Sequence, residues 1–177
     1  NEIIGILGPN GCGKTTTIGM ILGLLKPTSG KVLINGIEVE SNRVELLNNL
    51  NFISPYIELP KKLTVKQNLE VYGRLYDVKN LSSKIDYLTE KLRLNEIIYK
   101  ITGELSSGQK NRVSLAKSII NDPTVLLLDE PTASLDPETG DFVRSFLENY
   151  QKEKEASILL ASHNMAEVER LCSSILM

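Results

Sequence analysis

A glycine-rich loop stands between an apolar run and a helical stretch at the start of this 177-residue chain. Residues 3–7 are apolar without alternation, which is typical of a buried parallel strand. They lead into Gly8-Pro9-Asn10-Gly11-Cys12-Gly13-Lys14-Thr15, after which residues 14–22 have the composition of a helix. Strand, loop and helix in this order are the context that the pattern G-x-x-x-x-G-K-[ST] requires. The sequence therefore predicts a phosphate-binding loop in an α/β fold.

The residue types of this loop suit a nucleoside triphosphate. Glycines at 8, 11 and 13 let backbone N–H groups approach phosphate oxygens, and the helix N-terminus adds partial positive charge. Lys14 is expected to reach the β- and γ-phosphates, and the Thr15 hydroxyl to ligate Mg²⁺. A chance match is the alternative, against which the flanking strand and helix argue. We predict ATP and Mg²⁺ as ligands, with contacts from Gly8, Pro9, Asn10, Gly11, Cys12, Gly13, Lys14, Thr15 and Thr16.

A second predicted strand, residues 124–128, is apolar from Val125 onward and ends in two adjacent acids, Asp129 and Glu130. Such a strand presents both carboxylates at its C-terminal edge, where open α/β sheets bind ligands. Asp129 is expected to hold Mg²⁺ through the water shell of the ion, and Glu130 to polarise the attacking water. A strand that simply ends in a polar turn is the alternative, which the glycine loop disfavours.

With Leu-Ser-Ser-Gly-Gln at residues 105–109, the chain resembles the ATP-binding domain of ABC transporters, whose signature motif is L-S-G-G-Q. The resemblance covers essentially the whole chain. It implies that Ser106, Ser107, Gly108 and Gln109 complete the ATP site of an opposite subunit. Ser107 replaces a family glycine. The residues themselves also predict a capping box, Ser106 with Gln109, opening a helix over 107–120. The two interpretations are compatible.

Two further segments match this family. Residues 133–136, Ala-Ser-Leu-Asp, correspond to its D-loop, which implies that Asp136 touches the opposite site. Asp136 before Pro137 also predicts a helix N-cap. Residues 157–162 predict a buried strand, and His163, the only histidine, follows it. Its position matches the family's switch histidine, which implies contact with the γ-phosphate and the attacking water. A purely structural histidine is the alternative.

The chain departs from the family at two places. Residues 54–60, where the family carries a glutamine after a strand, contain none, and Gln67 with Thr64 instead predicts a capping box for a helix over 65–75. The family's adenine-stacking aromatic residue lies ahead of the phosphate loop, and no residue of this sequence can be assigned to it. The chain is expected to be a domain cropped at both ends.

The resemblance and the alternation of apolar strands with helices predict an α/β P-loop NTPase fold. We expect a mainly parallel sheet flanked by helices in a nucleotide-binding core of residues 1–54 and 121–177. A hairpin-like turn is predicted at Asn35-Gly36. Residues 55–120 lack a convincing strand and predict an inserted α-helical subdomain, with helices over 65–75, 82–92 and 107–120.

Composition excludes several classes of protein. The 20 Lys and Arg against 22 Asp and Glu give a net charge of −2, which argues against a nucleic-acid partner. No apolar run reaches membrane-spanning length, and no signal peptide is visible. Two cysteines without framework spacing fit a reducing cytoplasm.

The resemblance implies an ATPase that powers transport across a membrane, and it favours export over uptake. It also implies a head-to-tail dimer with ATP at the interface. The expected partners are a second nucleotide-binding domain, in a homodimer or heterodimer, and a transmembrane permease at the cytoplasmic face of the membrane. Tyr56, Ile57 and Leu59 are candidates for the permease contact, with ordinary packing as the alternative. Other open functions are a soluble ABC-family ATPase acting on ribosomes or nucleic acid, and a weakly hydrolysing nucleotide switch.

Overall fold

A parallel β-sheet forms the centre of the computed structural model, which describes residues 1–9, 11–55, 57–133 and 135–177. Within those residues the strands pair in the order β4-β5-β6-β1-β7, and each pair is parallel. The strands of this sheet are β1 (Ile3–Leu7), β4 (Leu50–Ile53), β5 (Val125–Asp129), β6 (Ser157–Ser162) and β7 (Ser174–Leu176). The predicted fold class is confirmed.

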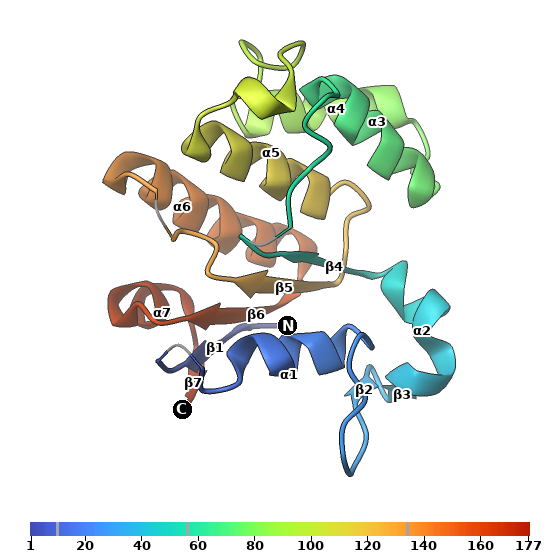
Figure 1. Ribbon diagram of the computed structural model, residues 1–177, viewed down its shortest axis with the longest axis vertical. Coiled ribbons are helices and arrows are strands. Elements are labelled where there is room, and N and C mark those ends of the chain that lie inside the picture. The colour runs from blue at the N-terminus through green and yellow to red at the C-terminus, as the bar shows by residue number, and fades with distance from the viewer. Residues whose placement is uncertain (10, 56, 134) are drawn as a thin grey trace.

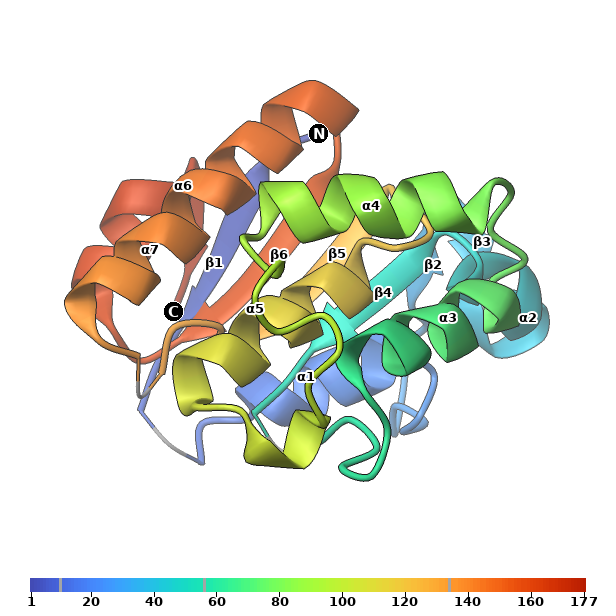
Figure 2. The same cartoon turned by 90° about the horizontal axis from the view of Figure 1, so that it is seen from above.

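Helices cover both faces of the sheet, as Figures 1 and 2 show. They are α1 (Lys14–Ile21), α2 (Val39–Leu47), α3 (Val65–Leu75), α4 (Leu81–Lys91), α5 (Ser107–Ser118), α6 (Pro137–Lys154), α7 (Met165–Leu171) and the short 3₁₀ helix η1 (Thr102–Glu104). In Figure 1, α1 lies below the sheet, and α5 and α6 lie above it, with α3 and α4 beyond them. The predicted helix over 82–92 begins and ends one residue earlier than expected.

Alternate residues of β5 supply the two faces of the sheet. Leu126 and Leu128 belong to the large hydrophobic cluster shared with α4, α5, α6 and α7. Leu127, between them, packs with Ile18 and Leu22 against the α1 side. A strand buried on both faces does not alternate apolar and polar side chains, which is why residues 125–128 are uniformly apolar.

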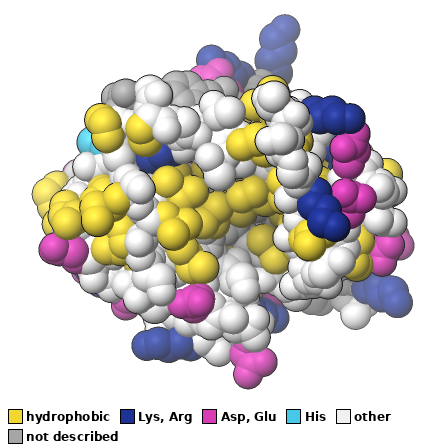
Figure 3. Space-filling view, turned by 90° about the horizontal axis from the view of Figure 1, so that it is seen from below, with side chains coloured by type: hydrophobic (Ala, Val, Ile, Leu, Met, Phe, Trp, Pro, Cys, Tyr) yellow, Lys and Arg dark blue, Asp and Glu magenta, His cyan; other side chains and the backbone are white. Residues whose placement is uncertain are grey.

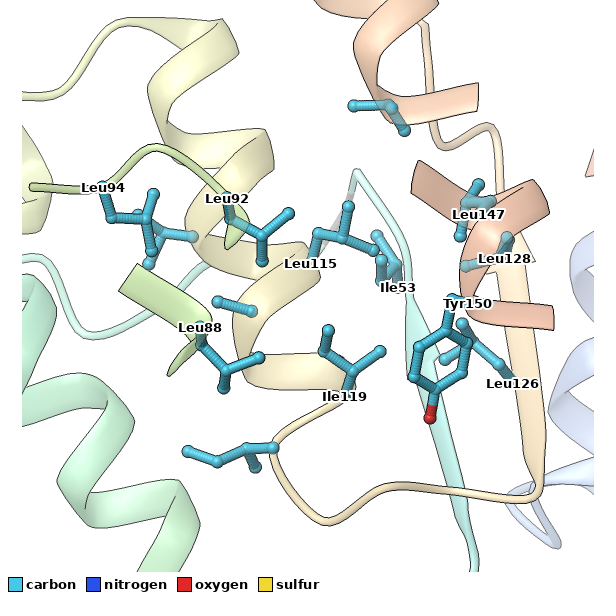
Figure 4. Packing of buried hydrophobic residues seen from close by; sticks show 14 of the residues in the cluster. Ile53, Leu88, Leu92, Leu94, Leu115, Ile119, Leu126, Leu128, Leu147 and Tyr150 are labelled. Atoms are coloured by element: carbon cyan, nitrogen blue, oxygen red, sulfur yellow. The ribbon is translucent and has the colours of Figure 1, made fainter. Parts of the chain in front are cut away.

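The helices of residues 55–120 share one continuous core with the sheet. Figure 4 shows Leu88 of α4 and Leu115 of α5 in the same cluster as Ile53 of β4 and Leu128 of β5. The division at residues 54 and 120 into a core and a helical subdomain therefore stays a prediction, since apolar packing crosses it.

Leu88→Ala is expected to destabilise the fold strongly, because Leu88 is fully buried where these helices meet the sheet. Removing a buried leucine side chain costs about 2–5 kcal/mol of unfolding free energy. Urea denaturation of the nucleotide-free protein measures this cost. Leu75→Ala is the matched control, since Leu75 is 72% exposed on α3. A change of similar size in both variants would contradict the assignment of Leu88 to the core.

Local side-chain pairs fix several helix starts. Thr64 and Gln67 form the predicted capping box at α3, with the Gln67 N–H donating to Thr64 Oγ1 at 3.2 Å.

The predicted turn at Asn35-Gly36 joins β2 (Leu33–Ile34) to β3 (Ile37–Glu38), and both turn residues have positive φ, 52° and 79°. Asn-Gly favours this two-residue hairpin because both residues tolerate that conformation.

The face below the sheet is strongly apolar. In Figure 3 hydrophobic side chains form a broad band there, with charged side chains mainly at its margins. Exposed apolar residues come from the turn after α1, from the β2–β3 hairpin and from the C-terminal strand: Leu24, Leu25, Leu33, Ile175, Leu176 and Met177. Large apolar patches of this kind often mark contact surfaces. In the described part of the chain, no helix combines the length and apolar character needed to cross a membrane.

Candidate functional site

The glycine loop runs from the end of β1 into α1 with a backbone that requires glycine at two points. Gly11 has φ +87° and Gly13 has φ +102°, a region that L side chains rarely adopt. A Cβ atom at either position would meet no atom within 4 Å, so the backbone angle and not the available space demands glycine. Gly13 is the N-cap of α1 and offers no side chain to the first-turn N–H groups. Those groups are thus available to an anion.

Lys14 is buried beneath this loop, with only 6% of its surface exposed. Its Nζ donates to the carbonyl oxygens of Gly8, at 2.7 Å, and Pro9, at 3.1 Å. The ammonium group is therefore held inside the curve of the loop, where phosphate oxygens would replace carbonyls as acceptors. A Cβ at Gly8 would lie 2.5 Å from Cys12 Sγ, so the loop packs tightly on itself there. Asn10 lies outside the described residues.

The two predicted metal-binding residues face each other. Thr15 Oγ1, at the start of α1, donates to Asp129 Oδ2 at 3.0 Å. Asp129 ends β5 and is 2% exposed. Burial raises the pKa of the Asp129 carboxyl group, and the negative charge of Glu130 raises it further. The hydrogen bond from Thr15 and the positive charge of Lys14 act in the opposite direction, but the net pKa is raised.

This arrangement fits Mg²⁺, because the ion prefers oxygen ligands and would relieve the cost of a buried carboxylate. No group of three or more His, Cys, Asp or Glu side chains that could hold a metal occurs among the described residues. One carboxylate and one hydroxyl suffice for Mg²⁺, because the ion usually keeps several waters and also binds phosphate oxygens of the substrate. Thr16, the next residue of the helix, is exposed.

Glu130 and His163 form a direct pair at the carboxyl ends of two neighbouring strands. Glu130 follows β5 and His163 follows β6. Glu130 Oε1 lies 2.7 Å from His163 Nδ1 and accepts from the His163 backbone N–H at 3.0 Å. Both residues were predicted to belong to the site, but the contact between them was not predicted. One carboxylate oxygen is therefore fixed by histidine, which leaves the second oxygen as the one that can take a water.

The backbone of Glu130 is in the left-handed region, with φ +51°. A glutamate rarely adopts this conformation, and such outliers gather at functional sites, where surrounding contacts hold them. The Glu130 N–H donates to the Ala161 carbonyl at 2.9 Å, which extends the β5–β6 ladder by one bond. The turn aims the carboxylate at His163, the residue that follows the neighbouring strand.

A second group of predicted residues gathers at the N-termini of α5 and α6. Ser106 and Gln109 form the predicted capping box, with the Gln109 N–H donating to Ser106 Oγ at 3.3 Å. Asp136 is the predicted N-cap of α6, and its Oδ1 accepts from the Thr139 N–H at 2.9 Å. A Cβ at Gly108 would lie 3.3 Å from Thr139 Oγ1. The starts of the two helices are therefore adjacent.

These helix starts are open to solvent. Ser106 and Ser107 are exposed, and Gly108 is half-buried. The start of α5 is therefore accessible from solvent, as a site for an anion on another molecule requires. Ser134 of the predicted D-loop lies outside the described residues.

A cleft of about 220 Å³ lies between the two groups. Its lining includes Glu130, Ser107 and Asn111 of α5, and residues 53–55 and 57–59. The stretch without the expected glutamine therefore borders the site. Of the predicted permease contacts, Leu59 is buried and Ile57 is exposed, while Tyr56 lies outside the described residues.

Sequence analysis missed two residues that hold the segment after Glu130. Asn111 Nδ2 of α5 donates to the Pro131 carbonyl at 2.7 Å, and Glu167 of α7 accepts from Thr132 Oγ1 at 2.6 Å. A signal for Glu167 was present: it stands beside Val168 and four residues before Leu171, which are both buried. An acid on the apolar face of a helix is a candidate for a buried, hydrogen-bonded role.

Comparison with known proteins adds a family and several relatives. Residues 1–133 match a family model described as ABC transporter. The ABC transporter ATP-binding protein NatA of Bacillus subtilis is 33% identical over 99% of this chain and 72% of its own length. The Nod factor export ATP-binding protein I of Rhizobium johnstonii is 38% identical, and the bacitracin transport ATP-binding protein BcrA of Bacillus licheniformis 36%. The chain covers 56% of each of these two.

Two solved structures of ABC transporter proteins are also similar to this chain. One described as an ATP binding subunit of an ABC transporter superposes with a TM-score of 0.87 at 28% identity, over 99% of this chain and 73% of the other. CbiO1 from Clostridium perfringens, described as part of the ABC transporter complex cbiONQ, gives a TM-score of 0.84 at 30% identity, over 98% and 72%. Both likenesses extend over nearly the whole of this chain.

Proposed function

The chain belongs to the ABC transporter family, and we propose that it binds and hydrolyses ATP to drive transport through a membrane-embedded partner. The observation that carries hydrolysis is the Glu130–His163 pair, which stands beside the buried Lys14 and the Thr15–Asp129 contact. A binding site alone needs the glycine loop; it has no use for a glutamate held in a left-handed turn against a histidine.

In the proposed mechanism the glycine loop and Lys14 hold the β- and γ-phosphates of ATP. Mg²⁺ held near Thr15 and Asp129 would neutralise charge on the phosphate oxygens. Glu130 accepts a hydrogen bond from a water through the oxygen that His163 does not occupy, and so orients that water for attack on the γ-phosphorus. His163 fixes the Glu130 carboxylate and adds a contact to the γ-phosphate. Most of the rate enhancement then comes from positioning and charge, as in phosphoryl transfer generally.

We propose further that the site is completed by a second nucleotide-binding domain. The exposed N-terminus of α5, with Ser106, Ser107, Gly108 and Gln109, would contact the γ-phosphate held by the opposite subunit. Asp136 lies next to this helix start and would contact the same interface. ATP then acts as a bridge: its binding closes the dimer, and hydrolysis removes the γ-phosphate contacts and reopens it.

The direction of transport is proposed from the relatives. Several of them are named Nod factor export ATP-binding protein I. We propose that this chain serves export as well, and that a permease holds it at the cytoplasmic face of the membrane.

Steady-state ATPase measurement of the full-length protein together with its permease tests this function. The expected result is Mg²⁺-dependent turnover that transport substrate stimulates. ATP binding without turnover above the rate of a Glu130→Gln variant would instead establish a nucleotide switch. Turnover stimulated by ribosomes or nucleic acid and not by the permease would contradict transport.

A further inference from the structure

A buried glutamate outside the proposed catalytic group lies beneath the loop that carries His163. Glu167, in the first turn of α7, is 2% exposed. Its Oε1 accepts from Thr132 Oγ1 at 2.6 Å and its Oε2 accepts from Ser162 Oγ at 2.8 Å. A buried carboxylate is costly unless hydrogen bonds satisfy it, and bonds to a charged acceptor are the strong ones. Both carboxylate oxygens of Glu167 are satisfied by hydroxyls of the two loops at this site.

The two hydroxyls come from positions next to the proposed catalytic residues. Thr132 is two residues after Glu130, and Ser162 directly precedes His163. Ser162 Oγ also accepts from the Asn164 N–H at 3.1 Å. The backbone on both sides of His163 is therefore tied, through the Ser162 hydroxyl, to the same carboxylate that holds the loop of Glu130.

The loop after Glu130 is fixed from its other side as well. The Ala133 N–H donates to the Glu130 carbonyl at 3.1 Å, which closes a turn. Asn111 Nδ2, from α5, donates to the carbonyl of Pro131 at 2.7 Å. Pro131 and Thr132 are thus held between α5 and α7, and among the described residues of this loop the Thr132 bond alone links it to Glu167. That bond is the one to remove in a test.

We propose that Glu167 is a positioning residue for ATP hydrolysis, which clamps the loop of Glu130 to the loop of His163. The inference rests on the proposed function and adds a residue to it. With the clamp in place, Glu130 Oε1 stays within 2.7 Å of His163 Nδ1 and 3.0 Å of its N–H. Without it, each loop is anchored separately, and the carboxylate and the imidazole no longer share one fixed geometry. Small losses of alignment at such a site lower the rate of the chemical step.

The test compares Thr132→Val and Thr132→Ser in the full-length protein with its permease. Valine keeps the shape of threonine and deletes the hydroxyl, whereas serine keeps the hydroxyl. We expect Thr132→Val to lower kcat about tenfold with KM for ATP changed less than about threefold, because the bond positions the chemistry and does not contact the nucleotide. Thr132→Ser should restore kcat to within about threefold of the natural protein.

Glu167→Gln is the second variant, because it keeps shape and removes charge. Its expected effect on kcat is a decrease of about tenfold, again with little change in KM. Glu169→Gln is the matched control, an exposed glutamate on the same helix, and should leave both constants unchanged. If Glu167→Gln does not fold, the Thr132 pair still decides, since Thr132 is only half-buried in a loop.

A second readout separates positioning from general stability. The imidazole resonances of His163, assigned by their loss in His163→Gln, should shift in Thr132→Val and return in Thr132→Ser. A merely structural hydroxyl would lower the melting temperature and leave these resonances and kcat in place. That outcome overturns the proposal, as does an equal fall of kcat in the valine and serine variants. Failure of the ATPase function itself looks different, because the natural protein would then show no turnover to compare.

Discussion

Glu130→Gln is expected to bind ATP normally and to lose hydrolysis. The amide keeps the shape of the side chain and its contact with His163, but it cannot accept a proton from water. Loss of a positioned base lowers a rate by roughly 10²–10⁴-fold, so turnover should fall by at least about 100-fold. ATP affinity, which depends on the glycine loop and Lys14, should change by less than about threefold. Steady-state ATPase and titration with a fluorescent ATP analogue measure the two quantities.

Glu96→Gln is the matched control, because Glu96 is exposed and remote from these motifs in sequence. It should hydrolyse ATP at the natural rate. If Glu130→Gln also did so, the assignment of Glu130 as the water-orienting residue would be wrong. If it lost ATP binding together with turnover, the residue would instead support the nucleotide site as a whole.

Lys14→Ala should abolish productive ATP binding. Lys14 is only 6% exposed, and its Nζ donates to the Gly8 carbonyl inside the loop where the phosphates are expected. Charge-assisted hydrogen bonds to phosphate are stronger than neutral ones, and the loss of two is expected to weaken ATP affinity by about 100-fold or more. Isothermal titration with Mg-ATP measures this directly.

Removal of Lys14 also takes the Nζ donor away from the carbonyls of Gly8 and Pro9, of which Pro9 keeps the Cys12 N–H, so the loop itself becomes less fixed. Lys31→Ala, at an exposed position, controls for loss of positive charge alone. Affinity within about threefold of the natural protein for Lys14→Ala would contradict the assigned role of the lysine.

Much of this fold follows from local patterns. The capping boxes at Thr64 and Ser106 were predicted because each depends on two side chains three residues apart. The strands β1, β5 and β6 were predicted because a strand buried on both faces must be apolar throughout. The ends of α4 and α5 lie one and two residues before the predicted ends at 92 and 120, because a helix end also depends on tertiary packing, which periodicity alone does not give.

The contacts that assemble the site were beyond such patterns. The left-handed backbone conformation of Glu130 could not be predicted from residue preferences, because glutamate rarely adopts it. The Glu130–His163 pair joins residues 33 apart, and the Thr132–Glu167 bond joins residues 35 apart. Such contacts follow from strand order, which a single sequence does not give. The family resemblance supplied the roles of Glu130 and His163, but not the buried carboxylate beneath them.

Sedimentation of Glu130→Gln with and without Ser106→Arg, each with ATP, tests the central claim most directly. ATP bridging two half-sites predicts that Glu130→Gln sediments as a dimer with ATP and as a monomer without it. Ser106→Arg places a bulky side chain at the exposed start of α5 and should abolish this dimer while ATP binding persists. Ser83→Arg, at an exposed position in α4, should leave the dimer intact. A dimer that forms equally with Ser106→Arg would contradict the bridge, because the nucleotide would not lie against α5.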